Sequence, residues 1–244
     1  MEGRTGTPGQ TEDGTEAATP APPEPPIRFE LRAGAVTALP LAVAVGLFGV
    51  SFGVLSASSG GMGLLPALAM SATTFAGSAQ FAVASVLGAG GQPVAAIAAA
   101  LLLNARYLPI GISVANALAG PAWLRFLKAQ LVVDESWAIA AQGGGSFDGR
   151  RLVGAGIVLW LAWVGGTLVG AVGGEALGDP AALGIDAAFP ALFLALLVTQ
   201  LRSRTAVMAA VLGAAVSLAL VPFAPPGVPI VAAAAAALVG LVRR

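Results

Sequence analysis

The 244-residue chain is 57% hydrophobic and only 10% charged, with a formal net charge of zero. Together with a mean hydropathy of +0.87, this apolar share exceeds that of soluble domains and predicts an integral membrane protein. A net charge of zero argues against a nucleic-acid surface. The absence of both Cys and His excludes disulfides, thiolate nucleophiles, Ser-His triads and His-based zinc hydrolases. We therefore expect no enzyme, no cofactor and no metal site.

Residues 1–30 are expected to form a disordered cytoplasmic tail. The stretch up to residue 27 is rich in Thr, Gly, Pro and Glu and contains no apolar run. Such a segment cannot bury enough surface to offset the entropy of folding. Residues 31–244 are then expected to form one transmembrane domain.

The apolar runs after the tail predict an all-α integral membrane protein. A helix needs about 20 apolar residues to cross the hydrocarbon of a bilayer. We expect a polytopic bundle of seven or eight transmembrane helices, some broken or kinked, at about 34–58, 63–87, 93–118, 127–142, 152–173, 186–201, 205–221 and 226–241. The fourth segment is the weakest, because Lys128, Asp134 and Glu135 interrupt it, and its full crossing stays open.

Basic residues between the spans predict the orientation in the membrane. With eight spans, four clusters fall on one side, which the positive-inside rule assigns to the cytoplasm: Arg28 and Arg32, Arg150 and Arg151, Arg202 and Arg204, Arg243 and Arg244. We expect a multi-pass protein of the bacterial inner membrane with both termini in the cytoplasm. Arg125 and Lys128 fall on the opposite side in this arrangement, which favours a re-entrant or tilted fourth segment.

Glycines in the first span suggest close helix packing. Gly49 and Gly53 have the GxxxG spacing that lets helix backbones approach each other. The alternative is that these glycines clear space for a substrate. Pro40 removes one backbone hydrogen bond from the same span and is expected to kink it.

The second span carries polar residues at membrane depth. Ser71, Thr74 and Ser78 share one side of a helix, and hydroxyls of this kind often bond to the preceding turn. Gln80 differs, because its amide has two donors and two lone pairs and cannot satisfy them within its own helix. Two interpretations stay open for Gln80: it lines a site, or it joins two helices.

The third span contains "LLLNARYLPIG", with Asn104, Arg106 and Pro109 near its middle. An Arg at the middle of an isolated membrane helix costs about 2.5 to 17 kcal/mol, so Arg106 needs a carboxylate, carbonyls or water. Pro109 cannot donate to the carbonyl of Ala105, so the helix is expected to open there. Open backbone at membrane depth is tolerated where it lines a cavity, as in the broken helices of transporters.

The fourth segment supplies the counter-charge in "VVDESWAI". Asp134 and Glu135 are adjacent, so on a helix they point about 100° apart. One of them is expected to pair with Arg106 while the other faces water, where it can take up and release protons. The alternative is that both lie at an interface and cap a helix.

Four motifs, in this order, resemble the AzlC family of branched-chain amino acid permeases. "AMSATTFAGSAQFAVASVL" resembles the second-span signature of the family, and "LLLNARYLPIGISVA" resembles its Asn-x-Arg-(His/Tyr) motif through Asn104, Arg106 and Tyr107. "VVDES" is similar to the Thr-Asp-Glu motif of the family, with Val133 in the place of Thr. "LGIDAAFPALFLALLVTQL" resembles its Gly-(Leu/Ile)-Asp and Pro-Ala-Leu-Phe run.

The resemblance implies a secondary transporter that exports valine, leucine and isoleucine, driven by the proton or membrane potential. It also implies a complex with a smaller membrane subunit of the AzlD type. In this hypothesis Arg106 holds the substrate carboxylate, and Gln80, Asn104 and Tyr107 complete the polar shell. Either acidic residue at 134–135 holds the amino group or carries the proton, while Phe75 and Phe81 shape the pocket. A channel or a non-transporting scaffold subunit is the alternative.

Overall fold

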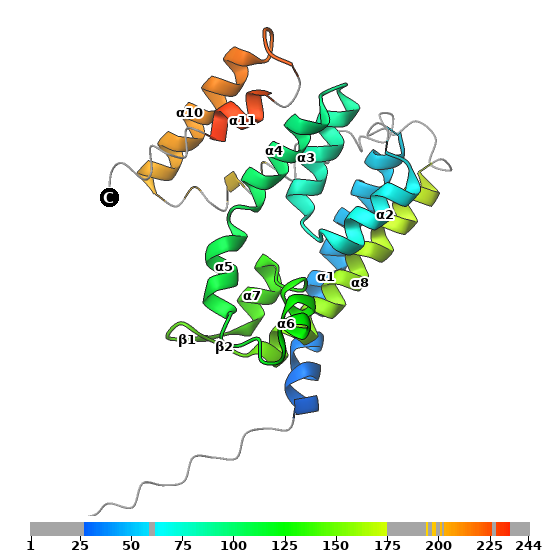
Figure 1. The fold of residues 1–244 in the computed structure, drawn as a ribbon, viewed down its shortest axis with the longest axis vertical. Coiled ribbons are helices and arrows are strands. Elements are labelled where there is room, and N and C mark those ends of the chain that lie inside the picture. The colour runs from blue at the N-terminus through cyan, green and yellow to red at the C-terminus, as the bar shows by residue number, and fades with distance from the viewer. Residues whose placement is uncertain are drawn as a thin grey trace, which may run out of the picture.

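The structure is a computed structural model that describes residues 27–58, 62–174, 203–225 and 228–234, with residues 194, 197, 198 and 201 besides. These residues are mainly helical, which confirms the all-α class (Figure 1). The predicted tail lies outside the described residues except for its end, because the first helix already begins at Ile27. Most of the predicted spans 186–201 and 226–241 also lies outside them.

Two helices of the described residues, α1 and α8, are long and apolar enough to cross a membrane, and the count rises to three if the bent pair α4 and α5 is taken as one span. The described residues therefore support an apolar helical bundle but not the predicted count of seven or eight spans. The elements in chain order are α1 (Ile27–Ser58), α2 (Leu64–Thr73), α3 (Gly77–Gly88), α4 (Pro93–Asn104), α5 (Tyr107–Val114), α6 (Ala122–Ala129), α7 (Asp134–Ala140), β1 (Ala141–Gly143), β2 (Ser146–Phe147), α8 (Gly149–Gly173), α10 (Arg204–Leu220) and α11 (Val228–Ala234).

Helices α1 and α8 pack side by side along their length (Figure 1). They run parallel, because Gly34 contacts Arg151 near the start of both helices and Gly49 contacts Trp163 further along. A Cβ added to Gly49 would lie 2.5 Å from the carbonyl oxygen of Trp163, and at Gly34 and Gly53 it would also meet the α8 backbone. This contact, called the glycine seam below, confirms the packing interpretation of the GxxxG spacing.

Helices α2 and α3 form a hairpin of two half-length helices. α2 starts beyond the C-terminal end of α1 and reaches the middle of α8, where the Trp160 indole donates to the carbonyl of Ala72 (3.0 Å). α3 then turns back, because Gly77 lies beside Trp163 and the next turn brings the Phe81 ring to 5.5 Å from the Phe52 ring, nearer the end of α1. Both helices therefore reach the same end of the bundle (Figure 1).

The prediction of one crossing at 63–87 is corrected by this hairpin. Between α2 and α3, Phe75 has a φ of 42°, in the left-handed region that a helix cannot pass through. Hydropathy did not indicate this, because an apolar hairpin and an apolar crossing have the same composition.

Helices α4 and α5 form the predicted broken span, bent by 45° at the break. Pro109 lacks an N–H, and the carbonyl of Ala105 instead accepts from Leu108 at 3.2 Å. α4 begins beside the end of α3, and the turn after α5 places the carbonyl of Ala117 against Gly149 at the start of α8. The pair therefore runs from one end of the bundle to the other.

Helices α6 and α7 form a second hairpin, which enters from the end where α1 and α8 begin. Leu131, between these helices, packs on Gly156, seven residues into α8, and α7 then returns, so that the Asp148 N–H donates to Ala140 (2.9 Å). The two hairpins meet where the Gln130 amide donates to the Thr73 carbonyl. The fourth segment therefore enters and leaves at the same end of the bundle, which favours the re-entrant interpretation.

The second hairpin removes the conflict in the charge pattern. Arg125 and Lys128 donate to the carbonyls of Ala115 and Ala119, at 3.2 and 2.6 Å. Those carbonyls follow α5 at the end of the bundle where α8 begins. Both basic residues therefore lie at the same end as Arg151, instead of opposite it.

Helices α10 and α11 pack against each other, and α11 contacts α4. α10 matches the predicted span at 205–221 and is capped by Ser203, whose hydroxyl accepts from the N–H of Ala206 (3.1 Å). Its apolar side chains, including Val211 and Leu218, are largely exposed.

Candidate functional site

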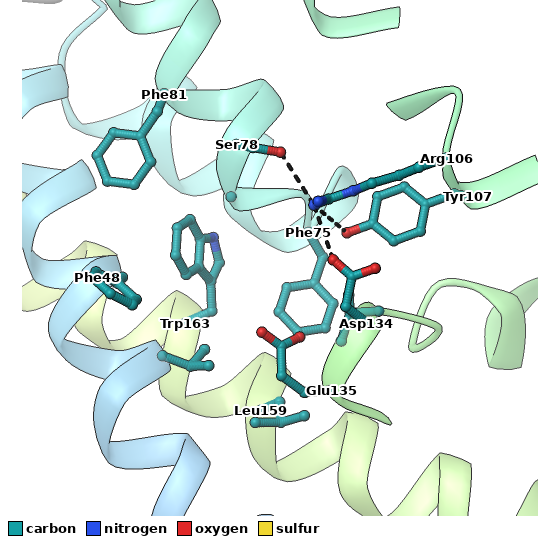
Figure 2. Close-up of a pocket in the computed structure, with 13 residues that line it drawn as sticks. Phe48, Phe75, Ser78, Phe81, Arg106, Tyr107, Asp134, Glu135, Leu159 and Trp163 are labelled. Atoms are coloured by element: carbon teal, nitrogen blue, oxygen red, sulfur yellow. Dashed lines mark hydrogen bonds and ion pairs between the residues drawn. The ribbon is translucent and has the colours of Figure 1, made fainter. Parts of the chain in front are cut away.

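The breaks in three pairs of helices meet at one cavity. α2 gives way to α3, α4 to α5 and α6 to α7 around it, while α1 and α8 close the remaining sides. The cavity has a volume of about 110 Å³, which is room for several water molecules or a small solute. Its lining, shown in Figure 2, consists of Val45, Phe48, Phe75, Gly77, Ser78, Phe81, Arg106, Tyr107, Val133, Asp134, Glu135, Leu159 and Trp163.

Arg106 brings a positive charge to the cavity from the break between α4 and α5. Its Nη2 lies 3.1 Å from Oδ2 of Asp134 and donates to Ser78 Oγ at 3.3 Å and to Tyr107 Oη at 3.5 Å. The guanidinium carbon lies 5.2 Å from the centroid of the Tyr107 ring. Asp134 supplies the counter-charge that an arginine at membrane depth requires.

The guanidinium of Arg106 keeps donors for another partner. Among the described residues its hydrogen bonds all use Nη2, whereas Nε is buried without a partner. A guanidinium has five N–H donors, so Nη1 is available to a bound anion. The side chains of Arg106 and Asp134 are 38% and 43% exposed, so their ion pair is open to the cavity and not sealed in the core.

Glu135 faces a different part of the cavity from its neighbour Asp134. In Figure 2 its carboxylate lies on the side of Trp163, away from the pair formed by Arg106 and Asp134. This carboxylate accepts a hydrogen bond from the N–H of its own backbone, and among the described residues it has no ion-pair partner. The backbone is set by Ser136, whose Oγ accepts from the N–H of Val133 (3.0 Å) at the start of α7. The cavity thus contains one paired and one unpaired carboxylate.

Aromatic and aliphatic side chains form the opposite wall. Phe81 and Trp163 are almost fully buried and pack edge to face, with ring centroids 6.2 Å apart. Phe52 stacks behind Trp163 at 5.9 Å. Phe48 and Leu159 extend the wall on α1 and α8. The cavity therefore has the ion pair of Arg106 and Asp134 on one side and an apolar surface, with the Glu135 carboxylate beside it, on the other (Figure 2).

A closed ring of buried hydrogen bonds lies behind this wall. Gln80 Nε2 donates to Ser71 Oγ, and Ser71 lies against Thr167 Oγ1, both at 2.9 Å. Thr167 donates its proton to the Trp163 carbonyl (2.9 Å), so Ser71 must be the donor to Thr167. The Trp163 indole closes the ring by donating to Gln80 Oε1 (3.0 Å). The same Oε1 accepts from the N–H of Ala76 (3.1 Å).

Of the residues predicted for the site, the structure places six in the cavity lining: Phe75, Phe81, Arg106, Tyr107, Asp134 and Glu135. Gln80 is fully buried one layer behind, bonded to the wall and to the break between α2 and α3. Asn104, at the end of α4, is not part of the lining, and its Oδ1 is buried without a partner. No three acidic side chains converge anywhere in the described part of the chain.

Sequence reasoning missed Trp163 and Phe48. Trp163 stands in "WLAWVGGTLVGAVGG", where small residues dominate one of the longest apolar helices. A large indole in a helix otherwise rich in glycine is the signal that could have indicated it. Phe48 has no comparable signal in the sequence.

This fold and this site define a class: a polytopic helical membrane protein with a charged and aromatic cavity at the middle of its bundle. Residues 40–177, which include every residue of the cavity lining, match the family described as AzlC protein. The chain is also 32% identical over 209 residues to an uncharacterized membrane protein of Archaeoglobus fulgidus, which covers 84% of this chain and 91% of that protein. No solved structure matches.

The chain therefore belongs to the AzlC family. Family and relative together make it a transport-related membrane protein.

Proposed function

We propose that this chain is a secondary transporter that exports the branched-chain amino acids valine, leucine and isoleucine across the bacterial inner membrane. One observation carries the proposal: the cavity places a cation, an unpaired carboxylate and an aromatic wall around the same small volume. An amino acid with an apolar side chain presents an anion, a cation and an apolar group. The three parts of the cavity are complementary to the three parts of this substrate.

The carboxylate of the substrate is assigned to Arg106, whose Nη1 donors are free for a charge-assisted hydrogen bond. The first turn of α3, at Gly77 and Ser78, adds backbone N–H groups on the same side. The ammonium group is assigned to Glu135, because Asp134 already neutralises the arginine. The apolar side chain then lies against Phe81 and Trp163.

Transport requires the substrate to reach this cavity from both faces of the membrane. The two hairpins enter from opposite ends of the bundle and touch at Gln130 and Thr73, so movement of either would open one side. Glu135 can release a proton when the ammonium group arrives, which would couple export to the proton or membrane potential. A smaller AzlD-type membrane subunit is proposed as the partner, and no catalytic reaction or cofactor is part of the proposal.

The orientation is proposed with both termini in the cytoplasm. Arg125, Lys128 and Arg151 lie at one end of the bundle, where α1 and α8 begin. The positive-inside rule assigns that end to the cytoplasm.

The test is the intracellular content of valine, leucine and isoleucine in cells fed a branched-chain dipeptide. Co-expression of this chain with a candidate AzlD-type subunit should lower the accumulation, and Arg106→Ala should restore it to the level of cells without the transporter. Arg125→Ala is the matched control, because this arginine lies outside the cavity lining. Normal export by Arg106→Ala would contradict the site.

Loss of export by Arg106→Ala must be separated from misfolding. The variant leaves Asp134 without its counter-charge, which destabilises a protein more than removal of both partners. The double variant Arg106→Ala with Asp134→Ala removes both charges and should be found in the membrane, yet should not export. Export by the double variant would show that the ion pair between Arg106 and Asp134 serves only the packing of the helices and is not needed for transport.

The second candidate is a channel or a scaffold subunit, favoured by the ion pair between Arg106 and Asp134, which can fix the register of helices without binding a solute. Vesicles that contain the purified complex distinguish these functions. A transporter saturates with amino acid and responds to an uncoupler, a channel conducts without saturation at low substrate, and a scaffold does neither.

A further inference from the structure

The indole of Trp163 is the largest ring of the cavity wall, and its position depends on one buried amide. Trp163 is 4% exposed, and Gln80, which accepts its N–H, is fully buried. On the other side, a Cβ at Gly77 would come within 3.1 Å of the indole, so α3 holds the ring from two directions. A shift of this ring would change the depth of the cavity.

Only an amide fits the hydrogen bonds that meet at residue 80. Oε1 accepts from two N–H groups, those of Ala76 and Trp163, while Nε2 donates to Ser71. A carboxylate would lack the donor for Ser71 and would bury a charge, and a hydroxyl is too short to reach both sides. Gln80 therefore does two things at once, because it satisfies the backbone at the break between α2 and α3 and holds the indole.

We propose that Gln80 is a positioning residue that fixes the Trp163 indole as the end of the cavity and so sets the length of the substrate side chain. This statement rests on the proposed function, since the side chain in question is that of an amino acid. Gln80 acts through Trp163 and does not itself contact the substrate, which revises the direct contact expected from the sequence.

The first experiment measures selectivity in vesicles that contain the full chain with its partner subunit. Alanine, valine, leucine and phenylalanine compete with labelled leucine for uptake. Gln80→Leu removes the hydrogen bond to the ring, and Trp163→Phe keeps a smaller ring without its N–H. Both should reduce the preference for leucine over alanine by about tenfold or more, because each methylene in a fitted pocket is worth at least about tenfold.

The double variant and a control show whether the effect passes through the indole. If Gln80 acts only on Trp163, Gln80→Leu combined with Trp163→Phe should show the same preference as Trp163→Phe alone. Ser85→Ala, a change in the same helix outside the cavity lining, should keep the preference of the unchanged protein. Additive losses in the double variant would overturn the proposal.

A second measurement follows the indole directly and does not require transport. The full chain labelled with fluorotryptophan should give a ¹⁹F resonance that Trp163→Phe identifies and that Gln80→Leu shifts and broadens. An unchanged Trp163 resonance in Gln80→Leu would overturn the positioning role even if amino acids are transported. If the unchanged protein transports none of the four amino acids, the proposed function fails, and the inference about side-chain length fails with it.

Discussion

Asp134 and Glu135 are neighbours in the chain but serve opposite electrostatic purposes in the cavity. Their helical spacing turns one carboxylate toward Arg106 and leaves the other against the aromatic wall. A paired carboxylate stabilises the structure, because it neutralises an arginine that cannot lose its proton. An unpaired carboxylate that faces a cavity is instead available to a bound cation.

The two acidic residues should therefore respond differently to neutralisation. Glu135→Gln should weaken leucine binding by about 10- to 100-fold, the value of one hydrogen bond to a charged group, with unchanged thermal stability. Asp134→Asn should lower the unfolding temperature in detergent, because Arg106 loses its counter-charge. Equilibrium binding of labelled leucine and a thermal unfolding curve measure the two effects. The same unfolding temperature for both variants would contradict this division.

The glycine seam holds α1 and α8 together as a rigid pair, and the two hairpins pack against this pair. At Gly53 the backbones of α1 and α8 lie so close together that a methyl group has no room. At Gly165, by contrast, nothing lies within 4 Å of an added Cβ. Both glycines stand in long apolar helices, so they differ in packing and not in secondary structure. The pair offers a matched test of the seam.

Gly53→Ala should destabilise the protein by about 1–3 kcal/mol, because the added methyl group forces the helices apart. Gly165→Ala should leave stability unchanged or raise it by up to about 1 kcal/mol, since Ala favours helix over Gly. Denaturant titration of the purified protein measures both. Equal effects of the two substitutions would mean that α1 and α8 are not in contact as described.

Features that follow from residue type can be predicted from the sequence, whereas the direction that a helix takes after a turn cannot. Helix class, the seam at Gly49 and the break before Pro109 follow from hydropathy, glycine spacing and a missing N–H. The return of α3 depends on the left-handed backbone of Phe75, which no local propensity favours in an aromatic residue. The cavity charges at 106 and 134–135 were predicted because charged groups in apolar segments are conspicuous. Trp163 was not predicted, because an apolar ring in an apolar helix is ordinary.

The directions of the described helices and hairpins agree with one another in a single arrangement of the bundle. α1 and α8 are parallel, so the chain between them must run back along the bundle once, and the broken pair α4 and α5 does so. The hairpin of α2 and α3 and the hairpin of α6 and α7 then lie at opposite ends of the bundle. The described basic residues from the end of α5 to the first turn of α8, including Arg125 and Arg151, lie at one end of the bundle.

The chain has no cysteine, so single cysteines report this topology without a background. In oriented cells, Gln92→Cys, in the exposed turn before α4, should react with an impermeant maleimide added outside. Ser146→Cys, in the sheet before α8, should react only after permeabilisation. Met62→Cys is the external control. A crossing at 63–87 would instead place Gln92→Cys in the cytoplasm, protected from the reagent.

The parallel glycine seam has a consequence for how the protein is made. Gly34 and Arg151 touch in the finished fold but are separated by more than a hundred positions in the chain. At synthesis rates of about 5–20 residues per second, α1 waits on the order of ten seconds in the bilayer before α8 emerges. During that interval its row of glycines has not yet met its partner helix. The order of synthesis thus makes α8 the element whose arrival completes this seam.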